Sequence, residues 1–141
     1  MASSPRTQPA GNRTMNIARL DHLVLTVADI ERTCAFYTRV LGMEVVTFGE
    51  GRTALRFGQQ KINIHRRGHE HEPKAHLPVP GALDLCFIAD RPLVQVIERL
   101  HAEHWPIIEG PVERTGATQR IRSVYLRDPD LNLIEISELI A

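Results

Sequence analysis

The feature that most constrains the fold is an internal repeat, because the chain contains two copies of one sequence unit. The apolar runs LDHLVL and LDLCFI open the two copies, and their polar residues His22 and Asp84 lie 62 positions apart. Each copy has the pattern of a strand, then an amphipathic helix, then short strands. A repeat of this length indicates two equivalent modules. The 141 residues suffice for one compact domain that holds both.

The first copy begins with a β-rich run at residues 20–27 that is apolar on both faces, as in a strand covered on each side. Asp29 then offers a carboxylate to cap a helix, whose apolar residues recur every three or four positions as far as Leu41. Gly42 fits the end of this helix. Glycines separate the next strands, which are predicted at 43–48, 53–57 and 61–65.

The second copy follows a polar, proline-containing stretch at 66–80, whose histidines are expected to lie on the surface. The first strand of this copy is predicted at 83–89, and Asp90 is expected to cap the helix that follows. Residues 110–116 are predicted to form a loop because of their glycines and proline. The remaining strands are predicted at 106–108, 121–127 and 131–137.

These elements predict an α+β fold made of two βαβββ modules, each a curved mixed sheet with its helix on the outside. Residues 1–16 are expected to be a flexible N-terminal tail, and residues 17–141 a single domain made of modules 17–67 and 81–141. The tail lacks the apolar stretch of a secretory signal, and no apolar run reaches the roughly 20 residues that span a bilayer. We therefore expect no membrane partner and a cytoplasmic location.

The charge balance excludes one class of function. Lysine plus arginine and aspartate plus glutamate each number 17, so the basic excess typical of nucleic-acid-binding proteins is missing. No glycine-rich phosphate loop, nucleophile elbow or HExxH sequence is present. The two cysteines, Cys34 and Cys86, are too few for a disulfide framework and are expected to be small buried residues.

Polar side chains interrupt the apolar strands at matching places in the two copies. His22 and Asp84 lie in the first strands, whereas Asn63 and Glu135 each lie between two isoleucines in the last strands. Side chains alternate between the two faces of a strand, so these residues point to the face opposite the core. His65, two positions after Asn63, points to the same face. A divalent metal ion is one partner that such a set fits. Hydrogen bonds within the protein or a solvated face remain the alternatives.

The runs LDHLVLTVADIERTCAFYTRVLGM, at 20–43, and RDPDLNLIEI, at 127–136, resemble the vicinal oxygen chelate superfamily. That superfamily contains glyoxalase I, extradiol dioxygenases and bleomycin-binding proteins, and the resemblance extends from residue 17 to the C-terminus. Residues 57–80 and the run GALDLCFI are most similar to its glyoxalase domain-containing members. The resemblance implies that the two modules form an open, barrel-like cleft and that two chains pair as a homodimer.

The resemblance also implies a set of metal ligands. The first-strand histidine of the superfamily matches His22, and the last-strand glutamate matches Glu135. Metal-dependent members usually carry a histidine where this chain has Asp84, whose carboxylate can also bind a metal. The fourth position is Asn63 by the register of the repeat, or His65 one step along the same face. We favour His65 because a ring nitrogen binds Ni²⁺, Co²⁺, Mn²⁺, Fe²⁺ or Zn²⁺ better than an amide does.

Three functions follow from the resemblance. The first is a metal-dependent lyase or isomerase like glyoxalase I, acting on a small oxygen-chelating substrate such as a thiol–aldehyde adduct. In such an enzyme the ion binds two neighbouring oxygens as a Lewis acid, and Glu135 moves a proton as the catalytic base. The second function is a metal-dependent dioxygenase or thiol transferase. The third is a non-catalytic dimer that binds a drug or a metabolite.

Overall fold

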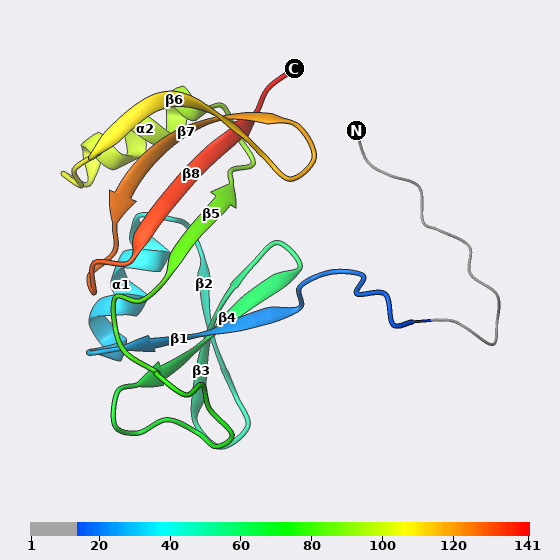
Figure 1. Cartoon of the computed structure of the whole chain (residues 1–141). Coiled ribbons are helices and arrows are strands. Elements are labelled where there is room, and N and C mark those ends of the chain that lie inside the picture. Colours follow the sequence, from blue (N-terminus) through cyan, green and yellow to red (C-terminus); the bar gives the residue numbers. More distant parts are fainter. Residues whose placement is uncertain (1–13) are drawn as a thin grey trace.

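The structure, a computed structural model, describes residues 14–141 and confirms the predicted repeat. Two four-stranded sheets have the same strand order, β1-β4-β3-β2 and β5-β8-β7-β6. In each sheet the first and last strands of the module pair in parallel, and the other pairs are antiparallel. The sheets are curved and open rather than closed into a barrel (Figure 1). Most of the expected tail, residues 1–13, lies outside the described part of the chain.

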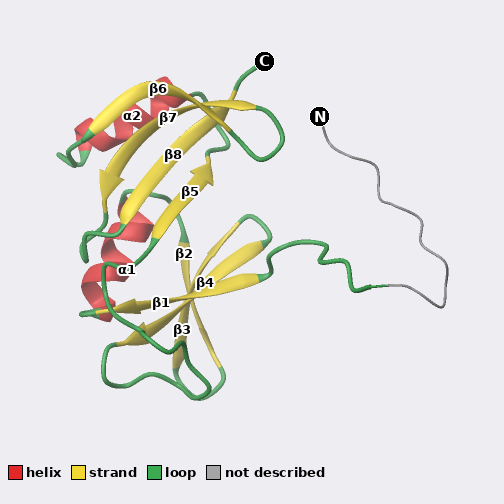
Figure 2. Cartoon of the chain, in the orientation of Figure 1, coloured by secondary structure: helices red, strands yellow, loops and turns green. Residues whose placement is uncertain are grey.

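Figure 2 shows the helices and strands of the two modules. The first module contains β1 (His22–Val27), α1 (Ile30–Arg39), β2 (Glu44–Phe48), β3 (Arg52–Phe57) and β4 (Gln60–Arg66). The second module contains β5 (Asp84–Ile88), α2 (Leu93–Ala102), β6 (Glu109–Thr115), β7 (Arg120–Arg127) and β8 (Leu133–Leu139). Within the described residues, neither helix has the length and hydropathy required to cross a membrane.

The first helix begins where the sequence predicts and ends at Arg39, two residues before the expected Leu41. The Asp29 side chain accepts a hydrogen bond of 3.0 Å from the backbone N–H of Arg32, which satisfies one of the free amides at the helix start. Beyond the helix, Gly42 has a φ of +71°, a left-handed conformation that glycine adopts without strain. The helix buries Phe36 and Tyr37 on the side that faces the core.

The expected cap of the second helix is wrong. Asp90 is exposed, and its carboxylate accepts a hydrogen bond of 2.9 Å from Arg91 Nε instead. The helix starts after Pro92, whose side chain cannot cap it. The backbone N–H of Leu93 donates to Glu138 Oε2 of β8 at 2.8 Å. The capping carboxylate therefore comes from a strand 45 residues along the chain, which no local sequence pattern reveals.

The sequence prediction is also wrong for residues 109–115, which form strand β6 rather than a loop. The predicted strand at 106–108 has no strand structure and lies just before the observed one. β6 is an edge strand of the second sheet, and one side of an edge strand has no neighbouring strand to bond. Pro111, which lacks a backbone N–H, is therefore tolerated there. A register shift in the pairing with β7 accommodates Gly110 and this proline.

Replacing Gly110 with alanine is expected to lower the free energy of unfolding by about 1–3 kcal/mol. Gly110 has a φ of +104°, and a Cβ there would press against the Ser123 carbonyl oxygen and lie 3.1 Å from the Cα of Val124. Denaturant unfolding measures the loss. Gly42→Ala is the matched control, because its φ is also positive but no atom of residues 14–141 lies within 4 Å of the new Cβ. Equal losses in the two variants would contradict the steric part of this argument.

The two modules share one hydrophobic core. The ring of Phe36 in α1 lies 4.6 Å from the ring of Trp105 in the second module, centroid to centroid. The rings of Phe57 and Phe87, one from each sheet, meet edge to face at 5.4 Å. α1 lies between the two sheets (Figure 1). The side of each sheet that faces the helices belongs to this core. The other side of each sheet, which carries the polar residues, therefore points away from the core and away from the other sheet.

A buried carboxylate also joins the modules. Asp128, which is 2% exposed, accepts a hydrogen bond of 2.7 Å from the Tyr37 hydroxyl of α1. It accepts three more, from the backbone N–H of Asp130 and of Asn132 and from the Asn132 side chain. Burial, followed by the negative charge of Asp128, raises the pKa of Tyr37, so this hydroxyl keeps its proton and donates. The turn between β7 and β8 thereby holds the first helix against the second sheet.

Candidate functional site

The first half-site is the polar face of β1 and β4, formed by His22, Asn63 and His65. The two strands pair in parallel, with Val24 opposite Asn63 and Thr26 opposite His65. Side chains alternate between the faces of a strand, so the three polar residues lie on the side opposite the buried leucine and isoleucines of these strands.

His22 is exposed, and among residues 14–141 only one of its ring nitrogens has a hydrogen-bond partner. Its Nδ1 lies 2.9 Å from the Asp21 carboxylate, which can only accept, so Nδ1 carries the proton. This hydrogen bond is the largest of the effects that lower the pKa of Asp21. The lone pair of His22 Nε2 is then available to a ligand, as in metal-binding histidines that a carboxylate orients.

Two polar atoms of the first half-site are buried without a hydrogen-bond partner among residues 14–141. They are Asn63 Oδ1 and His65 Nε2, in residues that are 6% and 4% exposed. A buried polar atom without a partner costs about 1–3 kcal/mol, so this face fits a bound ion, ligand or water. Burial lowers the pKa of His65, and the neighbouring His71 and Arg52 lower it further.

The second half-site is the corresponding face of β5 and β8, formed by Asp84, Cys86 and Glu135. Cys86 lies opposite Glu135 in the parallel pairing, and Asp84 lies two positions earlier on the same face. Ser123 Oγ of β7 donates to Glu135 Oε2 at 2.6 Å and lies 2.6 Å from Ser137 Oγ. These hydrogen bonds orient the Glu135 carboxylate.

Cys86 is a member of this face that the sequence prediction wrongly placed in the core. It is exposed, and its Sγ lies 3.4 Å from Ser137 Oγ, whereas Cys34 is half-buried beside the core. Desolvation raises the pKa of the Cys86 thiol, so the group is a neutral thiol. The sequence does contain the pattern that indicates this position for Cys86. Cys86 follows Asp84 by two residues, and side chains two positions apart in a strand share a face.

Two further side chains border Glu135, and the sequence analysis placed neither of them beside it. Tyr125 of β7 lies opposite Glu135 in the antiparallel pairing, and its hydroxyl accepts from Arg114 Nε at 3.1 Å. Arg114 also donates to the Glu109 carboxylate at 2.8 Å. Arg114 lies in the segment predicted as a loop, which is why its neighbourhood could not be inferred from strand alternation.

Strand register relates the two half-sites to each other. Asn63 lies two positions after the residue opposite His22. In the second sheet, Glu135 lies two positions after the residue opposite Asp84. Asn63 therefore occupies the place that Glu135 has in the other module. His65, which the chemistry of its ring favours as a ligand, lies two residues further along the same face.

The structure does not bring the four predicted ligands together within one chain. His22 and His65 belong to the first sheet, and Asp84 and Glu135 belong to the second. Across residues 14–141, no three histidine, cysteine, aspartate or glutamate side chains are close enough to hold a metal ion. Each half-site alone offers an incomplete set of ligands.

Comparisons of sequence identify relatives of this chain. The profile of the Glyoxalase/Bleomycin resistance protein/Dioxygenase superfamily matches residues 19–136. Virulence protein STM3117 of Salmonella typhimurium is 56% identical over 126 residues, which cover 89% of this chain and 88% of that protein. Glyoxalase domain-containing protein RDO1 of Mycosarcoma maydis is 51% identical over 130 residues, which cover 92% of this chain and 73% of that protein.

Solved structures share the arrangement of both modules. The crystal structure of STM3117 matches with a TM-score of 0.88 at 56% identity, covering 89% of this chain and 100% of that chain. The crystal structure of lactoylglutathione lyase from Agrobacterium tumefaciens has the same fold, with a TM-score of 0.67 at 23% identity and coverage of 87% and 95%. On its profile match and its relatives, this chain belongs to the Glyoxalase/Bleomycin resistance protein/Dioxygenase superfamily.

Proposed function

We propose that the protein is a homodimeric, glyoxalase-like enzyme that binds a divalent metal ion and acts as a lyase or isomerase on a small substrate with two neighbouring oxygens. One observation carries the proposal: the half-sites have the same register on two equivalent sheets, yet one chain does not bring them together. A second chain related by a two-fold axis can set the first half-site of one protomer against the second half-site of its partner.

The residues of the half-sites fit such an ion. His22 and Asn63 would come from one protomer, with Asp84 and Glu135 of the partner subunit completing the set. Ring-nitrogen and carboxylate donors suit Mn²⁺, Fe²⁺, Co²⁺, Ni²⁺ or Zn²⁺. The partnerless Asn63 Oδ1 and the free Nε2 of His22 support the first half of this set, and His65 is the alternative to Asn63.

When bound, the ion would supply Lewis-acid polarisation of the two substrate oxygens. Glu135 would take a proton from the carbon that bears the hydroxyl oxygen and return it to the adjacent carbonyl carbon, while the hydroxyl proton passes from the first oxygen to the second, which balances an isomerisation. Ser123 holds the Glu135 carboxylate for this role through the 2.6 Å hydrogen bond to Oε2. Tyr125 and Arg114 border the same face and would orient the substrate.

Metal content is the direct test. Protein purified without a chelator should contain about one ion per chain. After stripping, add-back of Ni²⁺, Co²⁺, Mn²⁺, Fe²⁺ or Zn²⁺ should raise the melting temperature, most strongly for the preferred ion. Sedimentation of the same samples should show a dimer. His76→Ala, at an exposed histidine outside both half-sites, is the control that should keep the full metal content.

Turnover separates the proposed lyase from its alternatives. The metal-loaded protein should convert the hemithioacetal of methylglyoxal, and chelation should abolish this activity. Turnover of a catechol or of fosfomycin instead would favour a dioxygenase or a thiol transferase on the same fold. Failure to bind any of the ions would reject the metalloenzyme and favour a non-catalytic dimer that binds a drug or a metabolite.

A further inference from the structure

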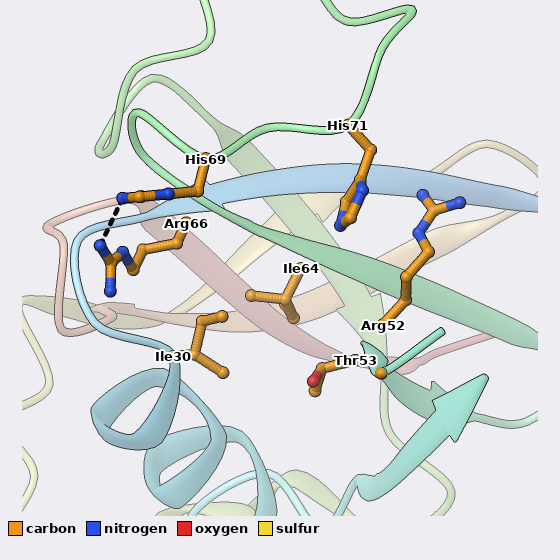
Figure 3. Close-up of a pocket in the computed structure, with 8 residues that line it drawn as sticks. Ile30, Arg52, Thr53, Ile64, Arg66, His69 and His71 are labelled. Carbon is orange, nitrogen blue, oxygen red and sulfur yellow. Dashed lines mark hydrogen bonds between the residues drawn. The ribbon is translucent and has the colours of Figure 1, made fainter. Parts of the chain in front are cut away.

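A cavity at one end of the first sheet, whose lining includes none of the described half-site residues, gathers positive charge. Its volume is about 340 Å³, which is enough for a small molecule. Four basic side chains line it, namely Arg52, Arg66, His69 and His71. Figure 3 shows Arg66 and His69 at one side of the cavity and Arg52 and His71 at the other. None of the described residues that line it is acidic.

The floor of the cavity is apolar. Ile30, at the start of α1, and Ile64, in β4, lie between the two basic sides, with Thr53 of β3 beside them (Figure 3). A lining that is apolar below and basic at the sides fits a small organic anion. The charged oxygens of such a molecule would face the arginines while its carbon body rests on the isoleucines.

The two arginines have no carboxylate within ion-pair distance in the described part of the chain. Arg66 donates to His69 Nε2, and Arg52 stacks over the Phe48 ring, with its guanidinium carbon 5.0 Å from the ring centroid. By contrast, Arg56 of the same strand as Arg52 pairs with a glutamate at 3.0 Å. Guanidinium groups stay charged and form paired hydrogen bonds with carboxylate or phosphate, so both cavity arginines are available to an anion.

Acidic residues that neighbour the lining residues in sequence do not themselves line the cavity. The Glu70 carboxylate accepts a hydrogen bond from the backbone N–H of Gly68 and lies 3.7 Å from Lys74. Asp29 caps the N-terminus of α1. Glu31 lines a neighbouring hollow to which Arg66 also belongs, but the two side chains form no ion pair in the described part of the chain. The basic side chains are therefore not neutralised from within the cavity, and its potential favours anions.

The segment that carries the two cavity histidines is anchored at both of its ends. The backbone N–H of Arg67 donates to the carbonyl of Val27 at 2.9 Å. Further along, the His71 ring packs against the buried His65 ring at a centroid distance of 5.2 Å. A binding site whose side chains are already held in place loses less entropy when a ligand enters.

We propose that this cavity binds the carboxylate or phosphate group of a small organic molecule, held by Arg52 and Arg66 over the isoleucine floor. The cavity lies where β1 and β4 end, whereas His22 begins β1, and of the first half-site only His65 contacts its lining, through the ring of His71. Thr26, which pairs with His65 at the cavity end of the sheet, lies four positions after His22 in β1, a distance of about 13 Å. Binding in the cavity therefore requires no metal ion.

Calorimetric titration of the metal-free, full-length protein tests the proposal, with butyrate and propyl phosphate as probes at an ionic strength fixed by sodium chloride. We expect saturable binding with about one site per chain, and the tighter probe identifies the anion. The double variant Arg52→Gln with Arg66→Gln should bind about tenfold more weakly or worse. Arg56→Gln removes the same charge outside the cavity and should bind as the wild type does.

The ring signals of His69 and His71 in NMR spectra give a second readout, because both should move when the wild type binds either probe. If sodium chloride alone gave the same calorimetric heats and the same shifts of the histidine signals, the effect would be ionic screening. That result would overturn the proposal. Equal affinity of the wild type and the double variant would overturn it too, as would the lack of saturable binding of both probes. If the double variant does not fold, the two single variants carry the comparison.

Discussion

The Asp128→Ala variant is expected to unfold with a free energy about 3–5 kcal/mol below that of the wild type. Asp128 accepts hydrogen bonds from the Tyr37 hydroxyl at 2.7 Å, from the Asn132 side chain at 2.8 Å and from two backbone N–H groups at 2.9 Å. Alanine would leave these donors buried without an acceptor. For a domain of this size, the melting temperature should fall by roughly 10–20 °C in calorimetry.

The Asp128→Asn variant separates hydrogen bonding from packing. The Asn132 side-chain NH₂ and the two backbone N–H groups that face Asp128 can only donate, so an amide NH₂ in place of either oxygen meets a donor. We expect a loss of at least about 2 kcal/mol although the two side chains have nearly the same shape. Asp130→Asn is the control in the same turn, because in the described part of the chain that carboxylate accepts only long contacts of 3.4 Å from the Ala28 N–H. An Asp128→Asn variant as stable as the wild type would refute this account.

The second large effect concerns metal binding by dimers in which one ligand of each half-site is replaced. Binding should be lost when both chains carry the same substitution and should be partly recovered when the two chains carry different ones. Homodimers of His22→Ala and of Glu135→Ala should each lose tight metal binding, since every site lacks one ligand. A mixed dimer of the two variants, isolated with two affinity tags, has one intact site and one site that lacks both ligands. We expect it to bind about half as much metal as the wild-type dimer.

The reverse arrangement is the matched control for this experiment. A wild-type chain is paired with a chain that carries both His22→Ala and Glu135→Ala, so each of the two sites in this dimer lacks one ligand. It should bind no metal tightly. If each site lay within one chain instead, this dimer would bind about half as much metal as the wild-type dimer. The mixed dimer of the two single variants would then bind no metal tightly. Sedimentation and thermal unfolding of every variant check that folded dimers are being compared.

The repeat and most strands could be predicted because the alternation of apolar and polar residues is a local property. Asn63 and Glu135, each between two isoleucines, lie on the faces away from the core as predicted. The same rule places Cys86 beside Glu135, and only the apolar character of the surrounding segment led to the opposite prediction. The neighbours of a residue on its own face of a sheet are therefore within reach of sequence analysis.

Contacts between distant segments could not be predicted in this way. Glu138 caps α2 from another strand, and Asp128 resembles an ordinary turn residue until Tyr37 of the other module reaches it. Gly110 and Pro111 favour a loop in any local analysis, and only the edge position of β6 makes them acceptable in a strand. The separation of the half-sites likewise depends on how the modules pack against each other.

The shared core makes the two modules a single cooperative unit, although the chain is built as a repeat. In extended repeat proteins each unit touches only its neighbours, and parts of the array can unfold on their own. Here the rings of Phe36 and Trp105 come from different modules and pack on one another. Neither module can lose its structure without exposing apolar surface of the other. A protease that nicks the exposed stretch between β4 and β5 should therefore leave two fragments that remain associated until the whole domain melts.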